Sequence, residues 1–119
     1  MRAMAIAGWM LLAGCANESA APAAAAGGDA ARGGVALERY GCGACHRIRG
    51  IAGGTGTVGP PLVAMSRRVY IGRGLPNSQD NMIRWIQSPQ SFAPGSAMPD
   101  MQVTAADAAD MVAYLYKAR

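Results

Sequence analysis

Aromatic and charged side chains are scarce in this sequence. Its 119 residues include one phenylalanine and one histidine, and charged residues make up 15% of the chain. A chain of this length has room for one small domain, and so few aromatic side chains leave its apolar core thin. Small domains commonly gain stability from disulfides, a metal or a cofactor. We therefore expect a bound group to complete the core.

Long apolar runs and basic runs are also missing. No apolar stretch reaches the roughly 20 residues of a membrane-spanning helix. The net charge is +4, but lysine and arginine form no basic run, and such a run or patch is typical of domains that bind nucleic acid. The composition therefore argues against a nucleic-acid partner and against a spanning helix.

The first fifteen residues have the pattern of an export signal. Arg2 supplies a positive charge, residues 3–13 are apolar, and Leu12-Ala13-Gly14-Cys15 ends this stretch with small residues before a cysteine. This ending resembles the lipobox of bacterial lipoproteins. The resemblance implies that the signal is removed, that Cys15 carries a lipid, and that the protein is anchored on the periplasmic side of a bacterial membrane. An ordinary signal peptide cut nearby and a single-pass anchor are the alternatives.

A change of composition separates this signal from the rest of the chain. Residues 16–28 are mostly alanine, with proline and glycine and no periodic apolar face. This composition predicts a flexible linker, with a frayed helical arm as the alternative. The predicted organisation is a lipoprotein-type signal peptide at 1–14, a lipidated cysteine with a linker at 15–28, and a folded domain at 29–119.

The folded domain begins with a predicted helix. Asp29 can cap it, and it extends through Tyr40. The pair Gly33-Gly34 lowers the stability of this helix relative to alanine, so we expect a packing reason for it, which is the close approach of another backbone. The partner that we expect there is the last segment of the chain, residues 104–119.

Capping signals indicate two further helices. Thr104 and Asp107 form a capping box for the last helix, and Asn77 with Asp80 forms a similar signal for a middle helix that Ser88-Pro89 ends. The apolar side chains of the last helix fall on one stripe: Ala108, Met111, Val112 and Leu115. Residues 47–74 lack any sustained period and predict a long loop, which in so small a domain is expected to wrap a ligand.

A Cys-x-x-Cys-His motif occupies Cys42 to His46. This is the pattern through which haem is attached covalently. On one helical turn Cys42 and Cys45 point the same way and can bond to the two vinyl groups of haem, while His46 is aimed at the iron. We therefore predict one covalent haem c, held by the two cysteines and ligated by His46.

Three other interpretations of this motif are weaker. A thioredoxin-like dithiol needs a βαβ context that the sequence does not have. A zinc site needs four ligands, whereas the chain has one histidine and three cysteines, of which Cys15 belongs to the signal. A plain disulfide would leave the thin core and the long loop unexplained.

The second axial ligand of such a haem cannot be another histidine, because the chain has only one. A methionine thioether is the obvious soft donor. Met98 lies in a loop stiffened by Pro94 and Pro99, which can hold a sulfur atom at a fixed distance. Met101 is the competing candidate and Met65 a third.

The domain at 29–119 resembles the small single-haem class I cytochromes c, including the cytochrome domains of haem-copper oxidase subunit II. The resemblance rests on six motifs along the domain. They are Tyr40 to His46, Gly59-Pro60-Pro61-Leu62, Leu75-Pro76-Asn77, Trp85 to Gln90, Pro94 to Pro99, and Ala113-Tyr114-Leu115. It implies an all-α fold, the class I cytochrome c fold, in which three main helices and their loops wrap around one covalent haem.

The resemblance also implies roles for individual residues. The Pro60 carbonyl would accept a hydrogen bond from the ring of His46, and Met98 would be the second iron ligand. Trp85 would pack near Met98, and Ser96 would lie near a haem propionate. The last helix would cross the first helix at its glycine.

A haem iron with both axial positions filled implies a one-electron carrier and not an enzyme. The expected partners are redox proteins such as a terminal oxidase or a dehydrogenase, together with the membrane through the lipid anchor, and we expect no small-molecule substrate. A haem subunit of a larger respiratory oxidoreductase is an alternative. A ligand-binding or peroxidatic haem protein, in which Met98 dissociates, is another.

Overall fold

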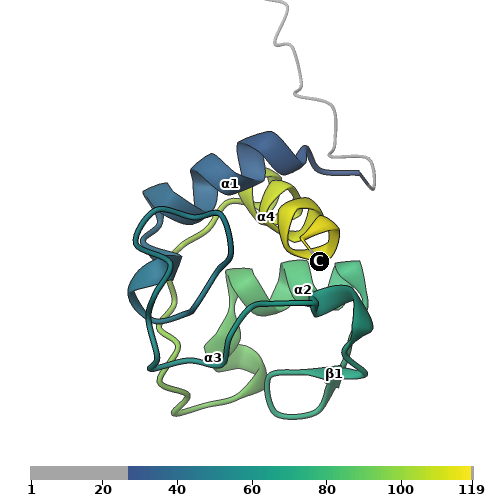
Figure 1. Cartoon of the computed structure of the whole chain (residues 1–119). Coiled ribbons are helices and arrows are strands. Elements are labelled where there is room, and N and C mark those ends of the chain that lie inside the picture. The colour runs from purple at the N-terminus through teal and green to yellow at the C-terminus, as the bar shows by residue number, and fades with distance from the viewer. Residues whose placement is uncertain (1–26, 119) are drawn as a thin grey trace, which may run out of the picture.

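The computed structural model describes residues 27–118 of the chain. These residues form four α-helices, and Figure 1 shows α1 and α4 side by side at the top of the molecule with α2 beneath α4. The helices are α1 (Ala30–Arg39), α2 (Gln79–Gln87), α3 (Pro89–Phe92) and α4 (Ala105–Lys117). This mostly helical architecture confirms the expected all-α fold.

The predicted signal peptide and all but the end of the linker lie outside the described residues, so the organisation predicted for residues 1–26 stays a prediction. Within residues 27–118, no helix is long and apolar enough to cross a bilayer.

Two short elements interrupt residues 47–74, which were predicted to be one long loop. The 3₁₀ turn η1 (Cys42–Ala44) precedes this segment, and the 3₁₀ turn η2 (Met65–Arg67) lies within it. Strand β1 (Tyr70–Ile71) also lies within it and pairs in antiparallel orientation with β2 (Leu75–Pro76), which follows it. The prediction of a continuous loop over residues 47–74 was therefore wrong in this stretch. Strands of two residues are too short to produce a visible period of two in the sequence.

The cap of α2 also differs from the prediction. Ser78 is the N-cap residue, and its side chain accepts a hydrogen bond from the backbone N–H of Asn81 at 3.1 Å. Asn77 lies one residue earlier and bonds to other segments, so the capping role expected for it was wrong. Asp80 lies in the first turn of α2, where its negative charge is favourable beside the helix N-terminus. The end of α2 before Ser88 is as predicted.

Helices α1 and α4 cross with their backbones in close contact. A Cβ atom built on Gly33 would lie 1.9 Å from the carbonyl oxygen of Asp110. Any side chain at Gly33 would therefore force the two helices apart. The close approach predicted from the Gly33-Gly34 pair is confirmed, and α4 is the partner that was expected.

The core is built around one face of α4. The predicted stripe on this helix is confirmed, because each of its four members is at most 2% exposed. Apolar side chains of α1 and α2 join the same cluster. These side chains are Ala36, Leu37, Met82 and Ile86.

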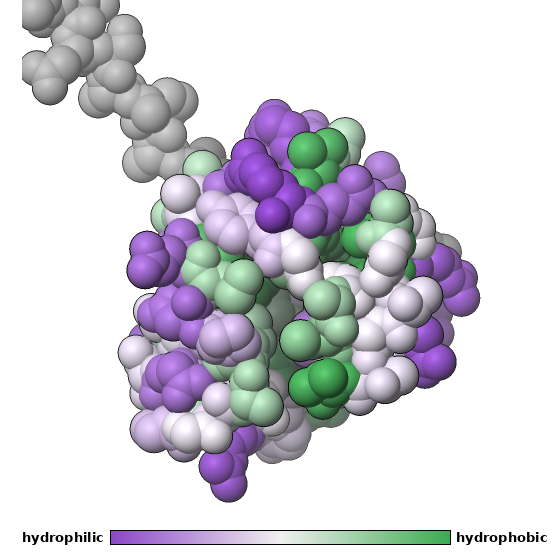
Figure 2. Space-filling model, turned by 90° about the vertical axis from the view of Figure 1, so that its left-hand side faces the viewer, coloured by the Kyte–Doolittle hydropathy of each residue, from purple (hydrophilic) through white to green (hydrophobic). Residues whose placement is uncertain are grey.

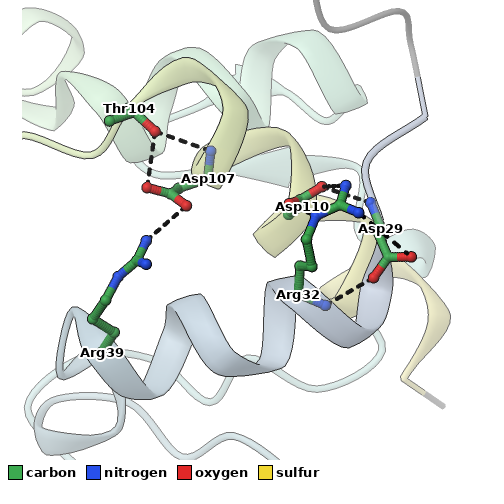
Figure 3. A network of polar contacts seen from close by, with 6 residues as sticks. All are labelled: Asp29, Arg32, Arg39, Thr104, Asp107 and Asp110. Atoms are coloured by element: carbon green, nitrogen blue, oxygen red, sulfur yellow. Dashed lines mark hydrogen bonds and ion pairs between the residues drawn. The ribbon is translucent and has the colours of Figure 1, made fainter.

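Ion pairs and hydrogen bonds surround the crossing of α1 and α4 (Figure 3). Arg32 Nε donates to Asp110 Oδ2 at 2.7 Å, and the backbone N–H of Asp29 donates to Asp110 Oδ1 at 2.6 Å. The hydrogen bond from Arg32 lowers the pKa of the Asp110 carboxyl. This contribution to stability is complete above the ordinary aspartate pKa of about 3.9 and is lost as the pH falls through the lowered value.

A second cluster lies at the other end of α1. The Thr104 hydroxyl and the Tyr40 hydroxyl donate to Asp107 Oδ2 at 2.8 and 2.9 Å. Arg39 Nη2 pairs with Asp107 Oδ1 at 2.7 Å. These contacts, with that of Thr104 foremost, lower the pKa of Asp107. The C-terminal end of α1, from which the haem-attachment motif continues, is thus fixed to the start of α4.

We predict that Gly33→Ala destabilises the fold by about 3 kcal/mol, because the added methyl group would overlap a backbone carbonyl that cannot move aside. Gly34→Ala is the matched control. Its Cβ atom would lie 3.1 Å from Cε2 of the Tyr114 ring, a side chain that can shift. Denaturant unfolding of both variants measures the difference, and equal stability of the two variants would contradict the close crossing.

Candidate functional site

The two cysteines of the motif lie on a single turn of 3₁₀ helix. Gly41, with a φ of 69°, turns the chain out of α1. The backbone N–H groups of Cys45 and His46 both donate to the carbonyl of Cys42, at 3.3 and 3.0 Å. Residues three apart in a 3₁₀ helix lie one above the other, which places Cys42 and Cys45 on the same side. Both are free thiols and are half-buried.

Burial also affects the chemistry of the first cysteine. Cys42 packs against the apolar core, and this burial raises the pKa of its thiol. A raised pKa keeps the side chain in the neutral thiol form near neutral pH.

The ring of His46 is fixed from one side by backbone atoms. His46 Nδ1 lies 2.7 Å from the carbonyl oxygen of Pro60. Because that oxygen can only accept, Nδ1 carries the proton and donates. Gly59 lies under the ring, since a Cβ atom there would be 2.3 Å from His46 Cε1. The arrangement leaves the lone pair of Nε2 for a metal ion.

Met98 lies in the loop after α3 and is half-buried, whereas Met101 is 41% exposed. The backbone N–H of Met98 donates to the Ser96 hydroxyl at 3.2 Å. The haem-propionate contact predicted for Ser96 stays a prediction. Met65, the third methionine candidate, is 3% exposed within the apolar core.

Trp85 lies on α2 and packs toward the hairpin and α3. A Cβ atom on Gly72 would lie 2.5 Å from Cζ3 of the indole, and the ring centroids of Trp85 and Phe92 are 6.5 Å apart. The packing against Met98 that the resemblance implied stays a prediction.

The surface beside this site is hollowed. Figure 2 shows the face that carries the loop after α1 in Figure 1, with apolar residues bordering a hollow near its centre. Several side chains that pack against the core are only partly buried, among them Tyr40, Leu62, Leu75, Ile83 and Trp85. Two thiols on one turn, an imidazole with its Nε2 lone pair available and an apolar hollow match the needs of a covalently attached haem. The residues present therefore fit this group.

Asn77 has a different role in the structure from the one predicted for it, and no individual role was predicted for Gln90. Asn77 Nδ2 donates to the carbonyls of Met65 and Arg68, both at 2.7 Å, and its Oδ1 accepts a hydrogen bond from the Tyr116 hydroxyl. Gln90 bonds in a similar way to the loop that contains Met98. The contacts of Asn77 span 9 to 39 residues and those of Gln90 span 5 to 8, so helix-capping patterns, which act over three or four residues, do not indicate them.

Comparison with known proteins agrees with this geometry. The sequence pattern of the family described as cytochrome c matches residues 30–119. Cytochrome c oxidase subunit 2 of Alkalihalophilus pseudofirmus is 35% identical over 81 residues, which cover 66% of this chain but 22% of that protein. The chain thus corresponds to about a fifth of that relative's length.

The family match covers both sides of the site, from the attachment turn to the loop with Met98. Members of this family bind haem c and carry electrons. The helical fold, the Cys-x-x-Cys-His turn and the family match together show that this chain, which is similar to the cytochrome domains of oxidases, belongs to the cytochrome c family.

Proposed function

We propose that this protein is a periplasmic one-electron carrier with one covalent haem c bound through Cys42 and Cys45 and ligated by His46 and Met98. The observation that carries the proposal is the hydrogen bond from His46 Nδ1 to the Pro60 carbonyl at 2.7 Å. It fixes the imidazole, directly after the two thiols, in the tautomer that offers Nε2 to the iron.

Each residue of the site has a distinct part in this function. When bound, the haem supplies an iron that accepts and releases one electron. Cys42 and Cys45 would hold the haem covalently, and His46 and Met98 would be the two protein ligands of its iron. Because the iron would then have no position for a substrate, the proposed role is that of an electron carrier and not of an enzyme. The Met98 thioether favours ferrous iron and raises the reduction potential.

The distribution of charge supports a redox partner with an acidic surface. Five arginines and no acidic residue lie between Tyr40 and Gln79, whereas the stretch from Asp80 to Ala118 contains two basic and four acidic residues, Asp80 included. Basic charge gathered in the loops around the attachment motif attracts an acidic surface at low ionic strength. A terminal oxidase or a dehydrogenase with such a surface fits this role.

A second candidate is a haem subunit of a larger respiratory oxidoreductase. It is favoured by the similarity to a protein named cytochrome c oxidase subunit 2, of which this chain spans 22%. A stable assembly needs a lasting interface, so the two candidates differ in whether the protein purifies as a monomer or with other subunits.

The location that we propose depends on the amino-terminal sequence. The apolar segment that ends at Leu12-Ala13-Gly14-Cys15 supports export and lipid attachment at Cys15. An anchor followed by a linker would keep the domain near the membrane and free to reach its partners.

We expect Cys42→Ala and Cys45→Ala each to prevent the normal attachment through two thioethers and to lower stability sharply, because the haem completes the core. Acid-acetone extraction and a pyridine haemochrome spectrum measure the attachment. Cys15→Ser is the matched control, since it removes a cysteine outside the domain. A Cys42→Ala protein that retains a spectrum of two thioethers would contradict the assignment.

Met98→Ala should lower the reduction potential by about 0.1 V or more, within the range of roughly 0.8 V that axial ligands set, and should open the iron to external ligands. Met101→Ala is the control and should change neither property. The long-wavelength absorption band that arises from charge transfer between a sulfur ligand and ferric iron reports the ligand directly. If this band survives in Met98→Ala and is lost in Met101→Ala, the second iron ligand is Met101 and not Met98.

Cys15→Ser should release the domain from the membrane fraction and leave its absorption spectrum unchanged. The reason is that the linker separates the anchor from the haem. Fractionation followed by a salt wash measures the release. A variant that stays with the washed membranes would show that Cys15 is not the anchor.

A further inference from the structure

The side chain of Gln90 bonds three times to the loop that contains Met98. Its Nε2 donates to the carbonyl of Ser96 at 2.9 Å and to the carbonyl of Met98 at 2.7 Å. Its Oε1 accepts a hydrogen bond from the backbone N–H of Gly95 at 3.0 Å. The carboxamide thus spans the loop from Gly95 to Met98.

The orientation of this carboxamide follows from its partners. The two carbonyl oxygens can only accept, so they face the nitrogen and use both of its N–H bonds. The Gly95 N–H can only donate, so it faces the oxygen. A glutamate at position 90 would keep the acceptor but would place an ionised oxygen against two carbonyl oxygens.

The backbone of Gln90 is itself firmly held. It belongs to α3, in which Pro89 is fully buried and the following Ala93 is 1% exposed. The backbone N–H of Ala93 donates to the carbonyl of Pro89 at 2.9 Å. The carboxamide therefore ties the loop to a turn that is anchored in the core.

The other bonds of the loop join residues that are close in sequence. Gly95 has a φ of 77° and turns the chain, and the backbone N–H of Ser96 donates to the carbonyl of Ala93 at 3.0 Å, which holds the start of the loop at the end of α3. The bond from the Met98 N–H to the Ser96 hydroxyl joins residues two apart and moves with the loop. The bond from Gln90 to the Met98 carbonyl instead fixes the residue that carries the thioether relative to α3.

We propose that Gln90 is a positioning residue that holds Met98 at the haem iron and sets how readily an external ligand replaces it. The proposal rests on the proposed ligation by Met98. For an external ligand to bind, the Met98 loop must move away, and the three bonds of Gln90 oppose this movement. Losing them should raise the population of the open loop and hence the apparent affinity for the ligand.

The test measures imidazole binding to the ferric holoprotein, together with the band from sulfur to iron. Gln90→Ala and Gln90→Glu should each bind imidazole roughly tenfold more tightly than the unchanged protein. Gln87→Glu is the matched control, because it places the same new charge at the end of α2. Among the residues that the structure describes, Gln87 makes no bond to the Met98 loop that would be lost, so this variant should bind imidazole within about twofold of the unchanged protein.

A merely structural role for Gln90 would give a different result. It would lower the denaturant midpoint of the variants and leave imidazole affinity unchanged, and this outcome overturns the proposal. A second measurement needs no variant. In the unchanged holoprotein the side-chain amide protons of Gln90 should exchange slowly with solvent, and rapid exchange also overturns the proposal.

Met98→Ala, measured in parallel, separates this inference from the proposed function. If the sulfur band disappears in Met98→Ala while the Gln90 variants bind imidazole like the unchanged protein, ligation by Met98 stands and positioning by Gln90 fails. If the band persists in Met98→Ala, both fail.

Discussion

The crossing of α1 and α4 at Gly33 is the constraint on which the rest of this small domain depends. The backbone of α4 lies so close that a Cβ atom on Gly33 would be 1.9 Å from the Asp110 carbonyl oxygen. Because α1 ends at Arg39 and the turn with the two cysteines begins at Cys42, the crossing also determines where this turn lies relative to α4. The bonds of Arg39 and Tyr40 to Asp107 hold that end of α1 in place. Helix packing and the placement of the two thiols are therefore parts of one arrangement.

Backbone carbonyls, rather than charged side chains, organise the groups around the site. The ring of His46 bonds to the carbonyl of Pro60, and the carboxamide of Gln90 bonds to the carbonyls of Ser96 and Met98. Such bonds are neutral, so they position a side chain without placing a new charge near the iron. In this loop-rich domain with few aromatic residues, such bonds tie the Pro60 segment to His46 and the Met98 loop to Gln90.

Much of this fold follows from local sequence signals, and what does not follow depends on distant contacts. The caps at Asp29 and Thr104 and the stripe on α4 are visible in the sequence, because capping and helical periodicity act over three or four residues. The Cys-x-x-Cys-His spacing likewise indicates the attachment turn. Asn77 was misassigned as a cap because its bonds to Met65 and Arg68 span 12 and 9 residues. A strand pair of two residues on each side leaves no pattern that could have revealed it.

The ion pairs at the helix crossing have an electrostatic consequence for the whole domain. Asp107 and Asp110 neutralise Arg39 and Arg32 within the contact of α1 and α4, so acidic and basic charge cancel over short distances there. The stretch between Tyr40 and Gln79 contains five arginines and no acidic residue, whereas the stretch from Asp80 to Ala118 contains two basic and four acidic residues. An uneven distribution of this kind gives a domain an electric dipole. In the field of an acidic surface a dipole experiences a torque, which turns its positive side toward that surface before the two molecules touch.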